Sequence, residues 1–257
     1  MDHIQIKSDL IEQLIEISKE AGEGILKVYN TDFDYQIKED SSPLTKADTL
    51  SNHIICERLK ILTPDIPILS EENSNIPFNI RSSWKQYWLV DPLDGTKEFI
   101  KRNGEFTVNI ALIENNTPIM GIVYSPVKKK LWYGLKGHGS FIINNKQEPI
   151  KISKKEPSNE IIKIVSSRSH ANNEKLKNYL KQFEKYELVN MGSSIKMCLV
   201  ADGTAHYYPR FGPTMEWDTG AAHAVVKYAN GNIYNIDTDE ELIYNKENLL
   251  NPGFIVK

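Results

Sequence analysis

One stretch of the sequence ends an apolar run in two aspartates, a proline, a glycine and a threonine. The apolar residues are Tyr87–Val90, and the polar part follows as Asp91-Pro92-Leu93-Asp94-Gly95-Thr96. Apolar residues rich in β-formers predict a buried strand, and acids that directly follow a strand lie at the edge of a sheet. Pro92 fixes its own φ and removes one N–H, which favours a Leu93 carbonyl turned towards whatever the carboxylates hold.

The chemistry of this stretch indicates a metal-dependent phosphatase. Gly95 permits close approach of the backbone, and Thr96–Ile100 predicts a short helix. A helix N-terminus beside paired carboxylates binds a phosphate only if a cation lies between the like charges. Ligands in an EF-hand loop alternate every second residue and a nucleophilic Asp-x-Asp motif has a spacing of two, whereas these acids are three apart. An N-cap followed by a turn remains the alternative for these residues alone.

Composition and charge exclude several classes of protein. The 257 residues are long for one domain and short for two, and the net charge of −3 provides no basic field for a nucleic acid polymer. No apolar run approaches the roughly 20 residues of a membrane span, and the N-terminus lacks a signal-peptide pattern. Cys56 and Cys198 have no metal-type spacing, so we expect reduced thiols in a cytoplasmic protein, either free or peripheral at the inner membrane.

Helical periodicity dominates the first third of the chain. Apolar spacing predicts a helix over 8–29, in which Gly22 and Gly24 indicate close packing, and a second helix from Thr45 to about residue 62. On the second helix we expect Leu50, Ile54 and Leu59 to face inward. A weak strand over 33–40 and a short strand over 66–69 complete this part, and the latter runs into Ser70-Glu71-Glu72.

Strands follow the central stretch, and the rhythm then changes. Turn residues separate candidate strands over 107–114, 119–124, 131–135 and 141–143, which predict an antiparallel block. After a polar segment at about 145–160, strands over 161–165, 188–189 and 205–208 alternate with helices over 172–183, 194–201 and 219–228. We therefore predict a single catalytic unit, 1–257, with an N-terminal α+β subdomain, 1–150, and a C-terminal α/β subdomain, 151–257.

Three motifs occur together along the chain. They are Ser70-Glu71-Glu72, Asp91–Thr96 and Trp217-Asp218-Thr219-Gly220-Ala221-Ala222. Asp218 alone would be an ordinary N-cap before a helix of small residues, and the two glutamates alone an exposed acidic loop. In this order the motifs resemble the signatures of the inositol monophosphatase superfamily of lithium-sensitive, magnesium-dependent phosphatases. The resemblance covers nearly the whole chain and implies an α+β / α/β fold, the layered αβαβα sandwich of these sugar phosphatases.

The resemblance also implies roles for individual residues. Asp91 would bridge two Mg²⁺ ions, of two or three in the site. Glu71 and the Leu93 carbonyl would complete one position, and Asp94 with Asp218 the other. Mg²⁺ prefers oxygen ligands, which agrees with this set. Catalytic roles in orienting and deprotonating the attacking water fall to Thr96 and Asp48, with assistance from Glu72, and the N–H groups of Gly95 and Thr96 would hold the phosphate.

Cationic residues favour a nucleotide substrate within this superfamily. Arg210 follows Tyr207-Tyr208-Pro209, where members that act on inositol have a glutamate, and a fixed cation suits a second phosphate. Ser193 and Lys196 open a predicted helix that forms another anion site, and His170 follows a strand, where it could contact a ribose or a base. These stretches resemble the bacterial 3′(2′),5′-bisphosphate nucleotidases.

That resemblance implies a small-molecule substrate. It is adenosine 3′,5′-bisphosphate, with its sulfated form as a further candidate, and the substrate-binding residues would be Gly95, Thr96, His170, Ser193, Lys196, Arg210 and Asp218. The alternatives are an inositol or fructose phosphatase and a non-catalytic sensor of metal and nucleotide. No nucleic acid polymer or integral membrane segment is expected, and the chain would act as a monomer or homodimer.

Overall fold

A seven-stranded sheet lies at the centre of the molecule. The computed structural model describes residues 8–257 except 33, 38–42, 146, 159–160 and 168–173. The sheet has the order β3-β4-β5-β6-β7-β8-β9. Its first pair, β3 with β4, is parallel, and all later neighbours are antiparallel. The bounds are β3 Ile68–Ser70, β4 Gln86–Asp94, β5 Thr107–Glu114, β6 Thr117–Ser125, β7 Lys130–Leu135, β8 Gly139–Asn144 and β9 Ile150–Ile152.

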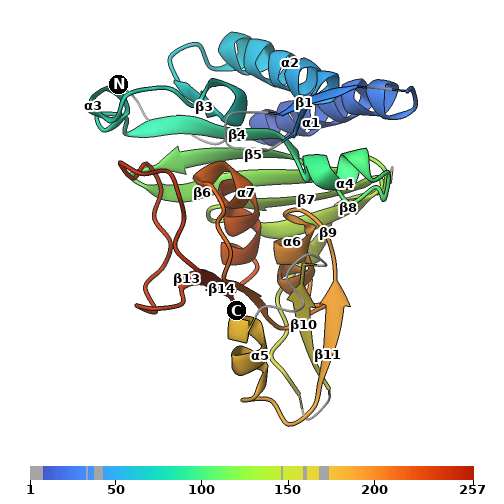
Figure 1. The fold of residues 1–257 in the computed structure, drawn as a ribbon. Helices are drawn as coiled ribbons and strands as arrows, with labels where there is room; N and C mark the ends of the chain where they lie inside the picture. Colours follow the sequence, from blue (N-terminus) through green and yellow to red (C-terminus); the bar gives the residue numbers. More distant parts are fainter. Residues whose placement is uncertain (1–7, 33, 38–42, 146, 159–160, 168–173) are drawn as a thin grey trace.

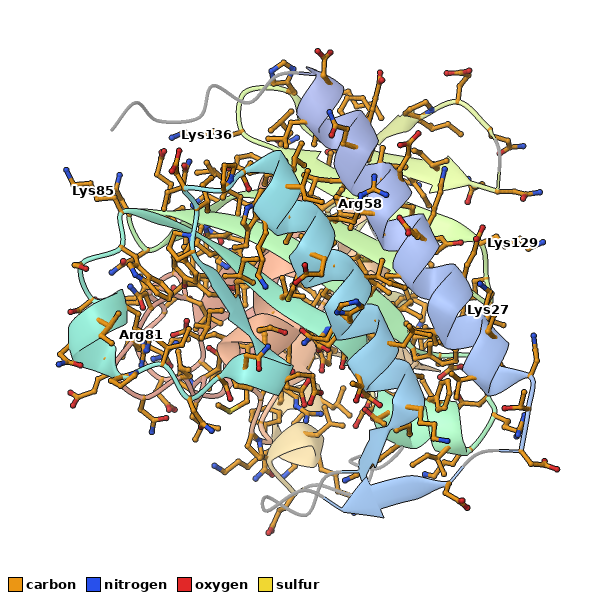
Figure 2. All side chains as sticks on the ribbon, turned by 90° about the horizontal axis from the view of Figure 1, so that it is seen from above. Lys27, Arg58, Arg81, Lys85, Lys129 and Lys136 are labelled. Atoms are coloured by element: carbon orange, nitrogen blue, oxygen red, sulfur yellow. The ribbon has the colours of Figure 1, made fainter. Side chains whose placement is uncertain are left out.

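Two long helices cover one face of this sheet. They are α1 (Ser8–Tyr29) and α2 (Lys46–Leu62), which lie side by side in Figure 2 and are joined at the surface by an ion pair of Arg58 with Glu20 at 2.7 Å. A Cβ on Gly22 would collide with the ring of Tyr124, so the predicted close packing of α1 is confirmed. A small ribbon of β1 (Tyr35–Ile37) and β2 (Pro43–Thr45) precedes α2.

The opposite face of the sheet packs against the C-terminal part of the chain. Helices α6 (Ile195–Ala201) and α7 (Glu216–Lys227) lie directly under the large sheet, followed by smaller sheets and then α5 (Glu174–Leu180), as Figure 1 shows. One small sheet is the parallel pair of β10 and β11, and the other has the order β12-β14-β13. The layers run αβαβα, which confirms the predicted fold class. The bounds are β10 Ile162–Ser166, β11 Tyr186–Asn190, β12 Tyr208–Arg210, β13 Ile233–Asn235 and β14 Phe254–Val256.

Several predicted details differ from the structure. Leu50 does not face inward, because the buried stripe of α2 follows Ala47, Ser51, Ile55 and Leu59 at intervals of four, and Leu50 remains 36% exposed beside α1. The strand expected over 205–208 lies instead at Tyr208–Arg210, where it pairs with the C-terminal strand β14. That partner and β13 are only three residues long, too short to show a strand pattern in the sequence.

The start of α7 also differs from the sequence-based prediction. The helix begins at Glu216 rather than at 219, because Met215 acts as the N-cap and Asp218 accepts its backbone N–H at 2.8 Å. Asp218 therefore lies within the first helical turn. Asn230 adopts the left-handed conformation expected after the helix, with φ of 66°. Among the described residues, no helix has the length and apolar character needed to cross a membrane.

Close contact between α7 and the sheet depends on two glycines. A Cβ on Gly121 of β6 would overlap the backbone carbonyl of Ala221, and one on Gly134 of β7 would lie 2.5 Å from the carbonyl oxygen of Ala224. The helix backbone cannot move away from the sheet without losing its apolar contacts, which include the buried residues Ala222 and Val225. The depth at which α7 sits is thus determined by the missing side chains.

We expect Gly121→Ala to destabilise the protein by about 1–3 kcal/mol, the usual cost of overpacking a core. The matched control is Gly24→Ala, whose Cβ would meet only the flexible ends of Ile54 at 3.0 Å and Leu50 at 3.4 Å. Alanine gains about 1 kcal/mol of helix propensity there, so the control should not lose stability. Urea unfolding measures both variants, and equal stabilities would contradict the packing argument.

Candidate active site

The end of β4 brings together three carboxylates. Oxygens of Asp91, Asp94 and Asp218 all lie within 4.8 Å of one another. The register of β4 shifts between Asp91 and Asp94, so the strand bulges at Pro92 and both acids face the same region. Asp218 reaches the group from the first turn of α7. The sequence placed two of these acids at a strand end, and the fold adds the third.

Burial and mutual repulsion act on all three acids. Burial raises the pKa of Asp91 well above its usual range, and the charges of Glu71, Asp94, Asp218 and Asp48 add to the effect. The pKa of Asp218 rises to about 8, first through burial and then through Asp94. Burial also raises the pKa of Asp94, against the opposing effect of Lys196. Three ionised carboxylates at this distance need a compensating positive charge.

The donor set fits a hard divalent cation. Asp91 is 1% exposed, and its Oδ1 accepts the N–H of Leu93 at 3.0 Å, while Oδ2 is buried without a hydrogen-bond partner. A buried carboxylate oxygen without a hydrogen-bond partner, close to two further carboxylates, is a group that could hold a cation. Glu71, on the short helix η1 (Glu71–Asn73), lies near enough to raise the pKa of Asp91, and Glu72 follows it, partly buried.

A second acidic group lies beside this cluster. Asp48 is buried in the first turn of α2, and its Oδ2 accepts the N–H and the hydroxyl of Thr45 at 2.8 and 2.6 Å. Its other oxygen accepts the hydroxyl of Thr96 at 3.3 Å, and Thr96 also lies 3.3 Å from the Leu93 carbonyl oxygen. The structure thus brings together Asp48 and Thr96, which are 48 residues apart in the sequence.

The loop before α6 completes the site from the other side of the cleft. Ser194 donates its backbone N–H to Asp94 and its hydroxyl to Asn109 Oδ1 at 2.9 Å. Thr107 lies within 3.0 Å of the hydroxyls of both Ser193 and Ser194. Sequence reasoning missed Thr107, Asn109 and Ser194 as site residues. The available signal was Asn109, a polar residue among the apolar residues of β5 between Thr107 and Glu114.

Lys196 has partners within the protein. Its Nζ donates to the Ser193 carbonyl at 2.6 Å and lies 5.6 Å from the ring centre of Tyr208. Burial lowers the pKa of Lys196 to about 8, although Asp94 acts in the opposite direction. Lys196 therefore compensates part of the negative charge of the cluster, in addition to facing the cleft.

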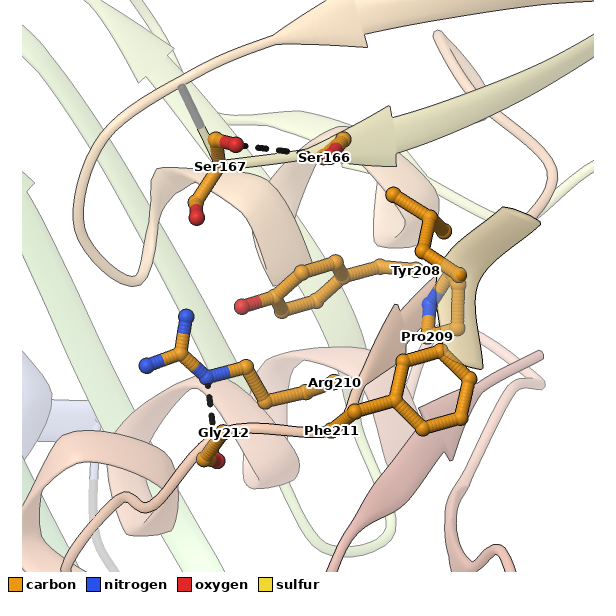
Figure 3. A pocket seen from close by; sticks show the side chains of 8 residues that line it. Ser166, Ser167, Tyr208, Pro209, Arg210, Phe211 and Gly212 are labelled. Carbon is orange, nitrogen blue, oxygen red and sulfur yellow. Dashed lines mark hydrogen bonds between the residues drawn. The ribbon is translucent and has the colours of Figure 1, made fainter. Parts of the chain in front are cut away.

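A cavity of about 200 Å³ connects the acids to the cations. Asp94, Gly95, Ser193, Lys196, Arg210 and Asp218 all line it. The guanidinium of Arg210 donates to the carbonyls of Gly212 at 3.2 Å and Pro213 at 3.1 Å. In Figure 3 it points towards Ser167 and the hydroxyl of Tyr208, across a smaller adjoining pocket of about 10 Å³. His170 lies outside the described residues.

Comparisons with known proteins agree with this geometry. A model of the inositol monophosphatase family matches residues 6–254. The chain is 44% identical over 249 residues to the 3′(2′),5′-bisphosphate nucleotidase CysQ of Salmonella typhimurium, covering 96% of this chain and 99% of that protein. It is 43% identical to CysQ of Escherichia coli K12, with the same coverage.

Solved structures of proteins with these names are also similar to this chain. The crystal structure of CysQ from Bacteroides thetaiotaomicron is 40% identical, with a TM-score of 0.86 over 99% of this chain and 98% of that one. The Thermotoga maritima IMPase has the same fold, with a TM-score of 0.80 at 20% identity over 97% of this chain and 92% of that one.

The charge of Asp91 should lower the stability of the folded protein when metal is absent and contribute to its stability when metal is bound. Since its pKa is raised, ionisation favours the unfolded state, and stability falls as pH rises above the ordinary carboxyl range. At pH 8 with a chelator, Asp91→Asn should therefore raise Tm by about 2 °C or more, the shift that ~1 kcal/mol produces at this chain length. Thermal unfolding with a chelator measures this effect.

If the cluster holds Mg²⁺, saturating metal should raise the Tm of the unaltered protein, because binding at 100-fold above Kd contributes about 2.7 kcal/mol, and Asp91→Asn should lose this increase. Asp65→Asn, a change at an exposed aspartate, is the control and should retain this increase. An Asp91→Asn protein that Mg²⁺ still stabilises fully would remove Asp91 from the ligand set.

Proposed function

Because this chain belongs to the inositol monophosphatase family, we propose that it is a Mg²⁺-dependent phosphomonoesterase that removes the 3′-phosphate of adenosine 3′,5′-bisphosphate, giving AMP and phosphate. Enzymes of this family are generally metal-dependent. One observation carries the proposal: a single cavity is lined by Asp94 and Asp218 of the carboxylate cluster and also by Lys196 and Arg210. The carboxylates suit a metal-held phosphate that is hydrolysed, and the cations suit a second phosphate that stays.

The ligand set of the metals follows from the acids and one carbonyl. Asp91 would hold Mg²⁺ together with Glu71 and the Leu93 carbonyl and together with Asp94 and Asp218, for two or three ions in all. Bound ions lower the pKa of a coordinated water and neutralise charge on the phosphate. The orphaned Oδ2 of Asp91 supports this assignment.

The residues around the ions orient the water and the phosphate. Thr96 donates its hydroxyl hydrogen to Asp48 Oδ1, so its oxygen can accept a hydrogen bond from the attacking water. The proton of that water then passes to Asp48, with Glu72 assisting from η1. The N–H groups of Gly95 and Thr96 hold the phosphate, as Gly95 adopts a φ of 94° that leads the chain into the helix α4 (Thr96–Ile100).

Substrate choice depends on the cations that line the cavity. Arg210 and Lys196 would bind the 5′-phosphate, and Ser193 would contribute beside them, since its φ of 51° turns the loop towards Gly95. His170 remains a candidate for the ribose or base. The names of the curated relatives, at 43–44% identity over nearly their full length, support a bisphosphate nucleotide over an inositol phosphate.

Phosphate release from a small set of substrates tests the activity. With Mg²⁺, we expect adenosine 3′,5′-bisphosphate to be hydrolysed faster than inositol 1-phosphate and fructose 1,6-bisphosphate, and chelation to abolish turnover. Uncatalysed phosphate ester hydrolysis is slower by up to ~10²¹-fold, so residual activity should be near background. Faster hydrolysis of inositol 1-phosphate would favour the sugar phosphatase alternative, and full activity in chelator would contradict a metal mechanism.

Arg210→Gln tests the second phosphate, because glutamine retains part of the stem and removes the charge. A charge-assisted hydrogen bond contributes about 1.5–3 kcal/mol, so kcat/KM for adenosine 3′,5′-bisphosphate should fall about ten- to a hundredfold. Adenosine 3′-monophosphate, which lacks only the 5′-phosphate, should be hydrolysed by the variant nearly as by the unaltered enzyme.

The matched substrates separate binding from folding, since a misfolded variant would lose activity on both. Lys196→Ala should affect both substrates to some degree, because Lys196 also binds the Ser193 carbonyl and faces Asp94. Equal losses for Arg210→Gln on the two nucleotides would contradict a role in gripping the 5′-phosphate.

A further inference from the structure

His223 is a completely buried histidine that the proposed reaction does not use. It lies on α7, five residues beyond Asp218. Its Nδ1 lies 2.9 Å from the hydroxyl of Tyr244, and its Nε2 lies 2.7 Å from Oδ1 of Asn232. An imidazole that has partners at both nitrogens fixes its neighbours in direction as well as in distance.

On the side away from the aspartates, His223 is held by an amide and a carboxylate. Asn232 Oδ1 accepts the N–H of Ile233 at 2.8 Å and its Nδ2 donates to Glu241 at 3.0 Å, so the amide has one orientation. Nε2 of His223 therefore donates to Asn232, with Glu241 Oε1 3.5 Å away. Lys227 also binds Glu241. The pKa of Glu241 is lowered to about 2, first by the nearby His223 and then by Lys227 and Asn232, against the opposing effect of burial.

On the side facing the aspartates, the contacts pass through Tyr244 to Thr219. The hydroxyls of Tyr244 and Thr219 lie 3.2 Å apart, and Asn251 Nδ2 donates to Thr219 Oγ1 at 3.1 Å. Thr219 Oγ1 also lies 3.1 Å from the carbonyl oxygen of Glu216. Thr219 directly follows Asp218 and lines the same cavity. A continuous set of polar contacts thus joins the buried histidine to the first turn of α7.

The contacts of α7 with the large sheet do not by themselves fix the position of the helix along its own axis. Gly121 and Gly134 of the sheet face the backbone of α7 at Ala221 and Ala224. The glycines have no side chain and the alanines have only a methyl group. Such contacts limit how closely the helix approaches the sheet, but small shifts along the helix axis change few of them. Hydrogen bonds have preferred directions and therefore supply that constraint.

We propose that His223 and Tyr244 are positioning residues for the carboxylate site. Through Thr219 they fix the axial position and rotation of the first turn of α7, and so the place of Asp218 opposite Asp94. The inference rests on the proposed function, because Asp218 is taken there as a metal ligand. Removal of groups that orient ligands typically weakens metal binding by about 10–100-fold.

Tyr244→Phe tests the proposal, since it removes one hydroxyl and keeps the ring. We expect it to bind Mg²⁺ about tenfold more weakly than the unaltered protein in a calorimetric titration. Tyr228→Phe is the matched control: its hydroxyl donates to the carbonyl of Pro118 at 3.0 Å, from the opposite end of α7, and Mg²⁺ affinity should not change. Equal Mg²⁺ affinity of Tyr244→Phe and the unaltered protein would overturn the proposal, whatever the effect on Tm.

Two substitutions of His223 separate the two sides of the network. An asparagine amide reaches the position of Nδ1, near Tyr244, whereas a glutamine amide reaches the position of Nε2, near Asn232. We expect His223→Asn to keep more of the Mg²⁺ affinity than His223→Gln. If the two variants differ only in Tm, the role of His223 is confined to folding and the proposal fails for that residue.

The outcomes also distinguish this proposal from the one on which it rests. Normal Mg²⁺ binding without phosphatase activity would overturn the proposed function alone. Absence of Mg²⁺ binding in the unaltered protein would overturn the metal assignment and the positioning role together.

Discussion

Repulsion between buried carboxylates is the constraint around which the site is built. In each acid, one carboxylate oxygen accepts a hydrogen bond from a backbone N–H, which reduces the cost of this repulsion. Leu93 binds Asp91, Ser194 binds Asp94, Met215 binds Asp218 and Thr45 binds Asp48. A backbone donor lowers the cost of the charge without neutralising it. Asp91, Asp94 and Asp218 still have oxygens within 4.8 Å of one another, where a divalent cation can bring together groups that would otherwise repel, while the second oxygen of Asp48 accepts the hydroxyl of Thr96.

The layered fold brings the four acids together from three layers. Asp91 and Asp94 lie on the central sheet, Asp218 lies on the helix beneath it, and Asp48 lies on the helix above. Only a sheet with helices on both faces brings the four acids to one edge, and α7 must touch the sheet closely, which Gly121 and Gly134 permit. The acidic motifs that carry the family resemblance therefore depend on how closely α7 approaches the sheet.

The sequence predicted features that depend on neighbouring residues and missed those that depend on distant ones. The strand ending in Asp91 and Asp94, the long helices and the antiparallel block all follow from local patterns. Asp218 joined the other acids only through the resemblance, since no periodicity relates a helix start to a strand that ends 124 residues earlier, at Asp94. Thr107 and Ser194 touch across 87 residues. The error at Leu50 arose because an apolar residue can cover a neighbouring helix and remain partly exposed.

Lys196 and Arg210, the two cations that suggested a nucleotide substrate, have different partners in the folded protein. Lys196 is enclosed, and its ammonium is directed to Ser193 and Asp94, so much of its charge serves the protein's own acids. Arg210 uses two of its five N–H groups on the carbonyls of Gly212 and Pro213. These bonds brace the guanidinium, which lines the cavity and presents a rigid, permanently charged fork. An anion in this cavity would therefore meet the charge of Arg210 more directly than that of Lys196, which is a counter-charge to Asp94 within the protein.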